Sequence, residues 1–187
     1  MAGTAPNRRV VSKEDLDAAR ARFVAVWGQM GATWGISRTM AEIHALLHIT
    51  GEPLNTDEIM EQLSISRGNA SMSLRSLVEW GIVSRVHRRG ERKEYFEAEQ
   101  DVWALSRKII RERLRREIHP LLTALYEVRD MTQGVGSGPA AEIVGDHNKR
   151  LDDLLELVQT IDRLGERFVG SDGRGLRLAA SVLSKIP

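Results

Sequence analysis

The segment at residues 54–97 constrains the fold more than any other, because it predicts two helices, a tight turn and a basic hairpin in close succession. The first helix follows a turn at residues 51–53, and Asn55 or Thr56 can accept hydrogen bonds from its free backbone N–H groups. Acidic residues in the next turn suit the positive end of the helix dipole. Residues 64–66 form only a turn, so a second helix begins directly after them.

The second predicted helix, residues 67–80, has one apolar and one polar side. Its apolar stripe consists of Ala70, Leu74 and Leu77. The opposite side carries Gly68, Met72, Arg75 and Glu79, flanked by Asn69, Ser71 and Ser76, and most of these groups are small, hydrogen-bonding or cationic. Such a surface suits a DNA major groove, where arginine reads guanine and asparagine reads adenine. An ordinary solvated helix face is the alternative.

Two short strands, at residues 82–87 and 93–97, follow this helix and are joined by a glycine-containing tip. The stretch from residue 67 to residue 93 holds seven basic and two acidic residues, a local charge of +5 in a chain whose total is +1. Arginine at such a tip can enter a minor groove or hold phosphates. A solvated charge run is the alternative here. The pattern predicts a winged helix-turn-helix, a mainly α fold with a small β-hairpin wing.

We therefore expect DNA contacts from both the second helix and the wing. The expected DNA-binding residues are Ser66, Arg67, Gly68, Asn69, Ser71, Met72, Arg75, Arg88, Arg89, Arg92 and Lys93.

Three runs within this segment carry a family resemblance. They are LSISRGNASMSLR at residues 63–75, WGIV at residues 80–83 and RRGERKEYF at residues 88–96. The sequence resembles the GbsR-like branch of the MarR-type transcriptional regulators, over about residues 23–125. The resemblance implies a homodimeric DNA-binding repressor of bacteria or archaea. Relatives tied to osmoprotectant genes sense choline or similar compounds, but no pocket residue of this chain can be matched to that role.

Composition narrows the function classes. The chain has 187 residues, 42% of them hydrophobic, and no cysteine, which excludes disulfides and thiol catalysis. No apolar run reaches the roughly 20 residues of a membrane span, so we expect a cytoplasmic protein with no membrane partner. No nucleophile-elbow, phosphate-loop or dinucleotide signature occurs. His44 and His48 have metal-ligand spacing but no third ligand nearby. We expect no enzymatic activity, no cofactor and no metal.

Helices are predicted on both sides of the winged domain, and we divide the chain into four parts: a disordered tail at 1–11, an N-terminal dimerisation helix at 12–35, the winged domain at 36–100 and a helical dimerisation region at 101–187. In the second part, Ser12 and Asp15 can form a capping box, and the helix that follows carries surplus apolar residues.

The last part is predicted to hold a helix at 101–130, kinked near His119 by Pro120, and a linker at 132–139. A helix at 139–168 and a short helix at 176–186 follow. The apolar seam of the 139–168 helix is Leu151, Leu154, Val158, Ile161 and Phe168. We expect a dimer interface there, with folding back onto the same subunit as the alternative.

Four aromatic residues are candidates for an effector site, which are Phe23, Trp27, Trp34 and Trp103. Aromatic faces can hold a quaternary ammonium group, although core packing is the commoner role of such residues. The function predicted is a homodimeric repressor that binds a pseudo-palindromic operator in double-stranded DNA and is released by a small-molecule effector. The alternative is a winged-helix protein–protein interaction module. An enzyme with a winged dimerisation domain lacks room for a catalytic domain after residue 130.

Overall fold

The computed structural model describes residues 11–134 and 139–170. The chain divides into two compact units, Met1–Gln100 and Asp101–Pro187. Nearly all of the predicted tail and the whole predicted helix at 176–186 lie outside the described residues. Within the described residues, every helix is too short or too polar to cross a membrane.

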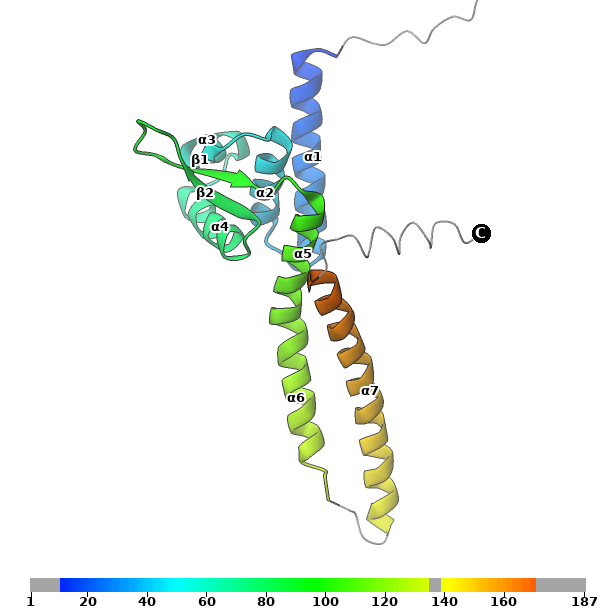
Figure 1. Ribbon diagram of the computed structural model, residues 1–187. Coiled ribbons are helices and arrows are strands. Elements are labelled where there is room, and N and C mark those ends of the chain that lie inside the picture. The colour runs from blue at the N-terminus through cyan, green and yellow to red at the C-terminus, as the bar shows by residue number, and fades with distance from the viewer. Residues whose placement is uncertain (1–10, 135–138, 171–187) are drawn as a thin grey trace, which may run out of the picture. The chain divides into compact units, whose positions relative to one another are not determined.

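The first unit is helical with one small sheet (Figure 1). Its helices are α1 (Lys13–Thr33), α2 (Arg38–Thr50), α3 (Thr56–Leu63) and α4 (Arg67–Glu79). Its strands are β1 (Leu54–Asn55), β2 (Val83–His87) and β3 (Glu94–Ala98). All pairings are antiparallel in the order β1-β3-β2, with Arg85 opposite Phe96 and Asn55 opposite Tyr95. The predicted helix-turn-helix and wing are confirmed, with strand ends shifted by about one residue.

Local capping begins these helices where the sequence predicts. Ser12 and Asp15 form the capping box of α1. Asn55 accepts hydrogen bonds from the N–H groups of Asp57 and Glu58, and the Glu58 carboxylate accepts from the Asn55 N–H. Each cap satisfies backbone donors that have no partner within the helix. The core of the unit forms behind them, and its largest fully buried side chains are Ile43, Leu47, Ile59, Leu77 and Val83.

Helix α1 packs on α2 through its smallest residues. The buried residues of α1 are Val24, Gly28 and Gly31. A Cβ atom at Gly31 would lie 2.5 Å from the Cβ of Ala41, so only glycine permits this approach. Of the apolar residues along α1, Leu16 and Val26 are exposed, whereas Trp27 is partly buried and stacks on His44 of α2. The closest approach of the two helices is at the glycines, which a pattern of apolar residues does not show.

The second unit contains α5 (Val102–Arg113), a π-helical turn η1 (Leu114–Ile118), α6 (His119–Asp130) and α7 (Pro139–Gly170). The predicted disturbance near Pro120 takes the form of η1, where the His119 N–H bonds to the Leu114 carbonyl. Proline has no N–H and its ring crowds the carbonyl four residues earlier, so the backbone widens by one residue just before it.

Helices α6 and α7 lie antiparallel (Figure 1). Arg129 binds Asp152 with an Nε–Oδ1 distance of 2.7 Å, and Gln159 donates to the Tyr126 hydroxyl at 2.6 Å. The predicted seam of α7 is divided between a buried and an exposed face. Its buried apolar residues are Leu155 and Val158.

Two predicted seam residues of α7, Leu154 and Ile161, are 42% and 44% exposed. Apolar residues cover more than one face of α7, and packing against α6 selects the face centred on Leu155. The alternative of folding back within one subunit therefore holds for this face.

Candidate nucleic-acid interface

The turn before α4 is fixed by two serines. Ser64 ends α3 in the left-handed backbone region, with φ of 52°. The Ser66 hydroxyl accepts a hydrogen bond from the Asn69 N–H at 3.3 Å and so caps α4. Ser66 was predicted to contact DNA, and in the structure its oxygen serves as a helix cap.

Helix α4 presents the two sides that its sequence predicts. Ala70, Leu74 and Leu77 are buried, which confirms the apolar stripe. Ser73 is buried beside them. The remaining predicted contact residues on the helix are exposed, which are Arg67, Gly68, Asn69, Ser71, Met72 and Arg75. The outward face is therefore open to a partner.

A single carboxylate joins α4 and the wing to α3. Asp57 accepts from Arg67 Nη2 at 2.5 Å and from Lys93 Nζ at 3.1 Å. The hydrogen bond from Arg67 and then the one from Lys93 lower the pKa of Asp57 below its ordinary value. The same contact raises the pKa of Lys93. Asp57 is one of the acidic residues expected to suit the dipole of α3, and nothing in the neighbouring sequence shows that two distant cations converge on it.

The wing also holds part of its charge internally. Arg88 donates to the Pro53 carbonyl at 3.1 Å, and its guanidinium carbon lies 4.3 Å from the centre of the Tyr95 ring. The Tyr95 hydroxyl donates to Glu91, which raises the pKa of the phenol. Arg85 pairs with Glu94 at 3.5 Å. Four of the seven basic residues counted in the sequence thus have intramolecular partners: Arg67, Arg85, Arg88 and Lys93.

Three arginines keep their charge uncompensated. Arg75 on α4 and Arg89 and Arg92 at the wing tip are exposed, and among the described residues no carboxylate pairs with them. They are the cations best able to meet phosphates or base edges.

The aromatic candidates for an effector site form a stack with two histidines. The Phe23 and Trp27 rings lie 5.6 Å apart, Trp27 lies 6.2 Å from His44, and His44 lies 5.8 Å from His48. Trp34 is exposed. The fourth candidate, Trp103, belongs to the second unit. For Phe23 and Trp27 the contacts are those of packed side chains, the alternative that the sequence left open.

His44 is buried, with 3% of its surface exposed, and its Nε2 has no hydrogen-bond partner. Burial and then the proximity of His48 lower the pKa of His44 to about 4. His48 Nδ1 lies 3.1 Å from the Glu99 carbonyl oxygen. A neutral, buried imidazole stacked on its neighbour is a packing element of this core.

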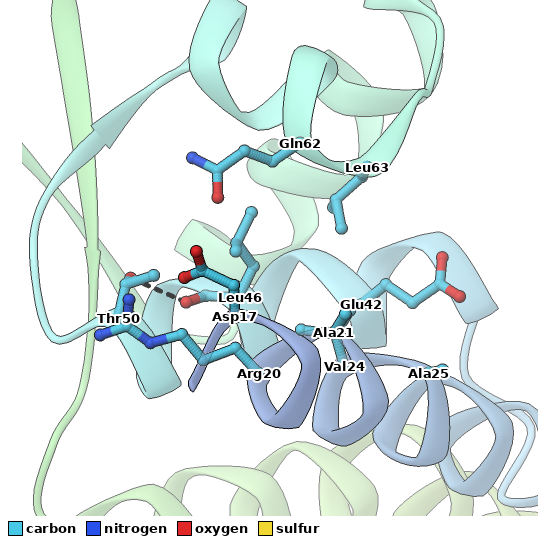
Figure 2. Close-up of a pocket in the computed structure, with 10 residues that line it drawn as sticks. All are labelled: Asp17, Arg20, Ala21, Val24, Ala25, Glu42, Leu46, Thr50, Gln62 and Leu63. Carbon is cyan, nitrogen blue, oxygen red and sulfur yellow. Dashed lines mark hydrogen bonds between the residues drawn. The ribbon is translucent and has the colours of Figure 1, made fainter. Parts of the chain in front are cut away.

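A cleft of about 490 Å³ lies between α1, α2 and α3 in the first unit (Figure 2). Its charged lining residues are Asp17, Arg20 and Glu42. The Thr50 hydroxyl, also at the cleft, donates to the Leu46 carbonyl at 2.8 Å. The aromatic candidates do not line this cleft, whose walls carry charges of both signs beside aliphatic side chains.

Comparisons with known proteins agree with this architecture. Residues 34–94 match the sequence model of the MarR family. The chain is 26% identical over 102 residues to the HTH-type transcriptional repressor GbsR of Bacillus subtilis, covering 54% of this chain and 56% of that protein. It is 23% identical over 171 residues to the putative HTH-type transcriptional regulator YvaV of the same organism, covering 84% and 91%.

The chain thus spans little more than half the length of GbsR. A crystal structure described as a transcriptional regulator superposes with a TM-score of 0.53 at 20% identity, covering 81% of this chain and 96% of that one, which supports the fold. Residues 34–94 are therefore similar to the MarR family and fold as a winged helix-turn-helix, in a chain that is also similar to GbsR and YvaV.

Proposed function

We propose that this protein is a sequence-specific DNA-binding transcriptional regulator that acts as a homodimeric repressor. The observation that carries the proposal is the set of uncompensated arginines Arg75, Arg89 and Arg92, carried on α4 and on the adjoining wing. Similarity to proteins named as repressors supports the direction of regulation.

In this proposal α4 enters the major groove. Gly68 has no neighbour within 4 Å of an added Cβ, so backbone can approach the duplex closely there. Asn69, Ser71 and Arg75 supply the hydrogen-bonding groups for base edges. Arg89 and Arg92 at the wing tip meet flanking phosphates or a narrow minor groove.

Dimerisation is proposed through the uncovered face of α7. Four of its exposed apolar residues recur three and four apart along the helix, and they are Leu154, Leu157, Ile161 and Leu164. This spacing is typical of the seam between two packed helices, and α7 of a second subunit would present the same seam. A two-fold dimer would present two α4 helices to half-sites about 10 base pairs apart in a pseudo-palindromic operator.

A small-molecule effector is the remaining element of the proposal. In the cleft of Figure 2 the Arg20 cation and the Asp17 carboxylate lie at one end, and the Glu42 carboxylate, which pairs with Arg38, lies at the other. Groups of both signs at one end suit a small molecule that carries both charges. Calorimetry with glycine betaine, a zwitterion, and with choline, a cation, tests this. Heat from neither compound at millimolar concentration contradicts an osmoprotectant effector.

The alternative function, a protein–protein interaction module, requires a more apolar outward face on α4. Met72 is 61% exposed and is the one large apolar residue on that face of the helix as described. The surrounding groups are polar or cationic, which favours nucleic acid.

The deciding experiment selects fragments of the source genome that bind the full-length protein. Binding of a selected fragment and of a scrambled one is then measured across a salt series. We expect one or a few fragments to bind at least 10³-fold more tightly than scrambled DNA, on the order found for specific regulators. Equal binding of both DNAs would contradict sequence-specific regulation.

A further inference from the structure

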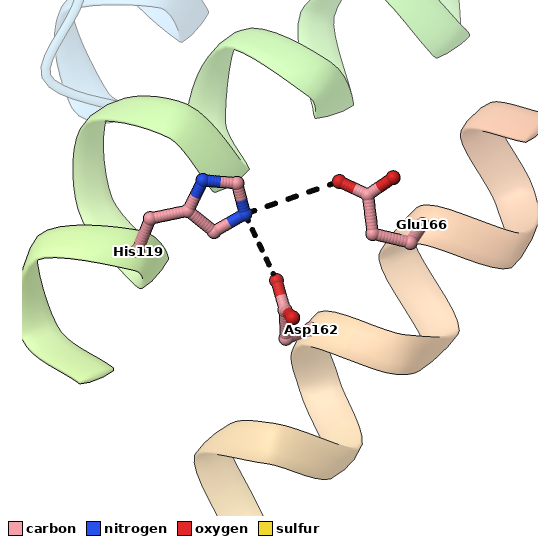
Figure 3. Close-up of side chains that lie close together, drawn as sticks. All are labelled: His119, Asp162 and Glu166. Carbon is pink, nitrogen blue, oxygen red and sulfur yellow. Dashed lines mark ion pairs between the residues drawn. The ribbon is translucent and has the colours of Figure 1, made fainter. Parts of the chain in front are cut away.

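Three side chains of the types that bind metal ions lie close together in the second unit (Figure 3). One comes from residue 119 and the other two from residues 162 and 166. His119 Nε2 lies 3.1 Å from Asp162 Oδ1 and 3.9 Å from Glu166 Oε1. One ligand atom from each residue lies within 4.8 Å of the others. The group joins α6 to α7.

Two features of the fold bring these side chains together. His119 is the first residue of α6, directly after the π-helical turn η1. Asp162 and Glu166 stand one turn apart on α7, so both carboxylates are on the same face. Between them, a Cβ on Gly165 would lie 2.8 Å from both terminal methyl carbons of Leu114. Glycine thus lets α7 approach η1 at the level of the cluster.

Asp162 is the most shielded member of the cluster, with 24% of its side chain exposed. Asp162 Oδ1 is shielded from solvent and has no hydrogen-bond partner, although it faces His119 Nε2. A buried carboxylate oxygen without a hydrogen bond is costly unless a cation compensates it. A metal ion between Nε2 and Oδ1 would use the lone pairs of both atoms.

The spacing suits a small transition-metal ion. Ligand atoms at about 2.0–2.1 Å from a tetrahedral zinc ion lie roughly 3.3 Å apart, a value calculated from that geometry. The observed separations of 3.1 and 3.9 Å lie on either side of it. An imidazole nitrogen favours zinc or a similar metal over magnesium or calcium, which take oxygen ligands.

We propose that His119, Asp162 and Glu166 form a binding site for a divalent metal ion of the zinc class. Water completes the coordination, because the side chains of His119 and Glu166 are about half exposed. The ion links the start of α6 to α7 and stabilises their packing when it binds. The site belongs to the second unit, shares no residue with the proposed DNA contacts and does not depend on the function proposed above.

The test uses the full-length protein and zinc sulfate. We expect one zinc ion per chain in a competition titration, together with an increase in Tm. Cobalt substitution adds a spectroscopic readout, since tetrahedral cobalt absorbs in the visible range. His119→Ala and Glu166→Gln should each weaken binding by about tenfold or more. Circular dichroism confirms that each variant is folded.

Two controls separate this site from other ligands on the chain. His147→Ala removes an exposed histidine of α7 outside the cluster, and His48→Ala removes one member of the histidine pair in the first unit. Both should keep the affinity and the cobalt spectrum of the wild type. Wild-type protein that binds no zinc at micromolar concentration would overturn the proposal. Unchanged binding by His119→Ala would overturn it equally.

Discussion

Lys93 in the wing hairpin and Asp57 in α3 are joined by an ion pair with an Nζ–Oδ2 distance of 3.1 Å. Because Asp57 also binds Arg67, one carboxylate orients the wing relative to the first turn of α4. The pair lowers the pKa of Asp57, so its stabilisation is present above the ordinary aspartate pKa. That stabilisation is lost as the pH falls through the lowered pKa of the folded state. Near neutral pH the contact is intact.

Asp57→Asn should increase binding to random DNA and reduce discrimination in favour of the operator. The substitution releases Arg67 and Lys93 for phosphates, so the slope of log K against log salt should steepen by up to about two units. Asp153→Asn, at an exposed position on α7, makes the same charge change as a control. Identical salt slopes for the two variants would argue against the role of Asp57 in restraining these cations.

Arg75→Ala and Arg89→Ala should impair DNA binding in different ways. Arg75 lies on the outward face of α4, so its loss should cost about 1–3 kcal/mol on the operator and relax the preference at one base position per half-site. Arg89 lies at the wing tip, and its loss should weaken operator and random DNA alike and reduce the salt slope by roughly one unit. Fluorescence anisotropy over a salt series measures both effects. Wild-type binding by both variants would mean that this face does not contact DNA.

The helix-turn-helix and wing could be predicted because their determinants are local. The caps at Ser12 and Asn55 and the apolar stripe that includes Leu74 depend on residues three or four apart, and the structure has them all. The two wing strands, β2 and β3, could also be predicted, because a short glycine-containing tip joins them.

Features that depend on distant partners could not be predicted in this way. Apolar residues cover two faces of α7, and only the position of α6 decides that Leu155 is buried and Leu154 exposed. The same holds for Asp57, whose two cations come from α4 and from the wing. The meeting of His119 with Asp162 likewise depends on the packing of α6 against α7. The spacing of residues along a single helix does not show these contacts.

Gly31→Ala should destabilise the first unit more than Gly28→Ala. At Gly31 the new methyl group would lie 2.5 Å from the Cβ of buried Ala41, which has no rotamer to change, so we expect a loss of about 1–3 kcal/mol. At Gly28 it would lie 2.5 Å from Glu42 Cγ, in a side chain that can rotate. Gly145→Ala, with nothing within 4 Å, should gain up to about 1 kcal/mol from helix propensity. Urea unfolding measures all three, and equal losses at Gly31 and Gly28 would contradict this packing.

Glutamate at both Leu154 and Leu157 should convert the proposed dimer to a monomer and weaken operator binding with it. Both residues are exposed on α7, so the change leaves the packing of α6 on α7 in place. Glutamate at Val158, which is 4% exposed, should instead unfold the α6–α7 pair. Sedimentation and circular dichroism separate the two outcomes. A double variant that remains a dimer would exclude this face of α7 as the interface.

The stability of the first unit should fall as the pH decreases from about 7 to about 4, because of His44. Burial, followed by the proximity of His48, lowers the pKa of folded His44 to about 4. The unfolded chain takes up this proton near the ordinary histidine pKa of about 6.5, so acid favours unfolding across that interval. Below the folded pKa the effect of this group levels off. The shift corresponds to a loss on the order of 3 kcal/mol in the free energy of unfolding.

His44→Leu should remove that part of the pH dependence while filling the same buried space beside Trp27. Because the Nε2 of His44 has no hydrogen-bond partner, the substitution leaves no newly unpaired group behind. His147→Gln, at an exposed position on α7, removes a histidine without changing the core and should keep the wild-type profile. Urea unfolding at a series of pH values between about 7 and 4.5 compares the three proteins. If His44→Leu loses stability with pH as steeply as the wild type, His44 is not the group that takes up the proton on unfolding.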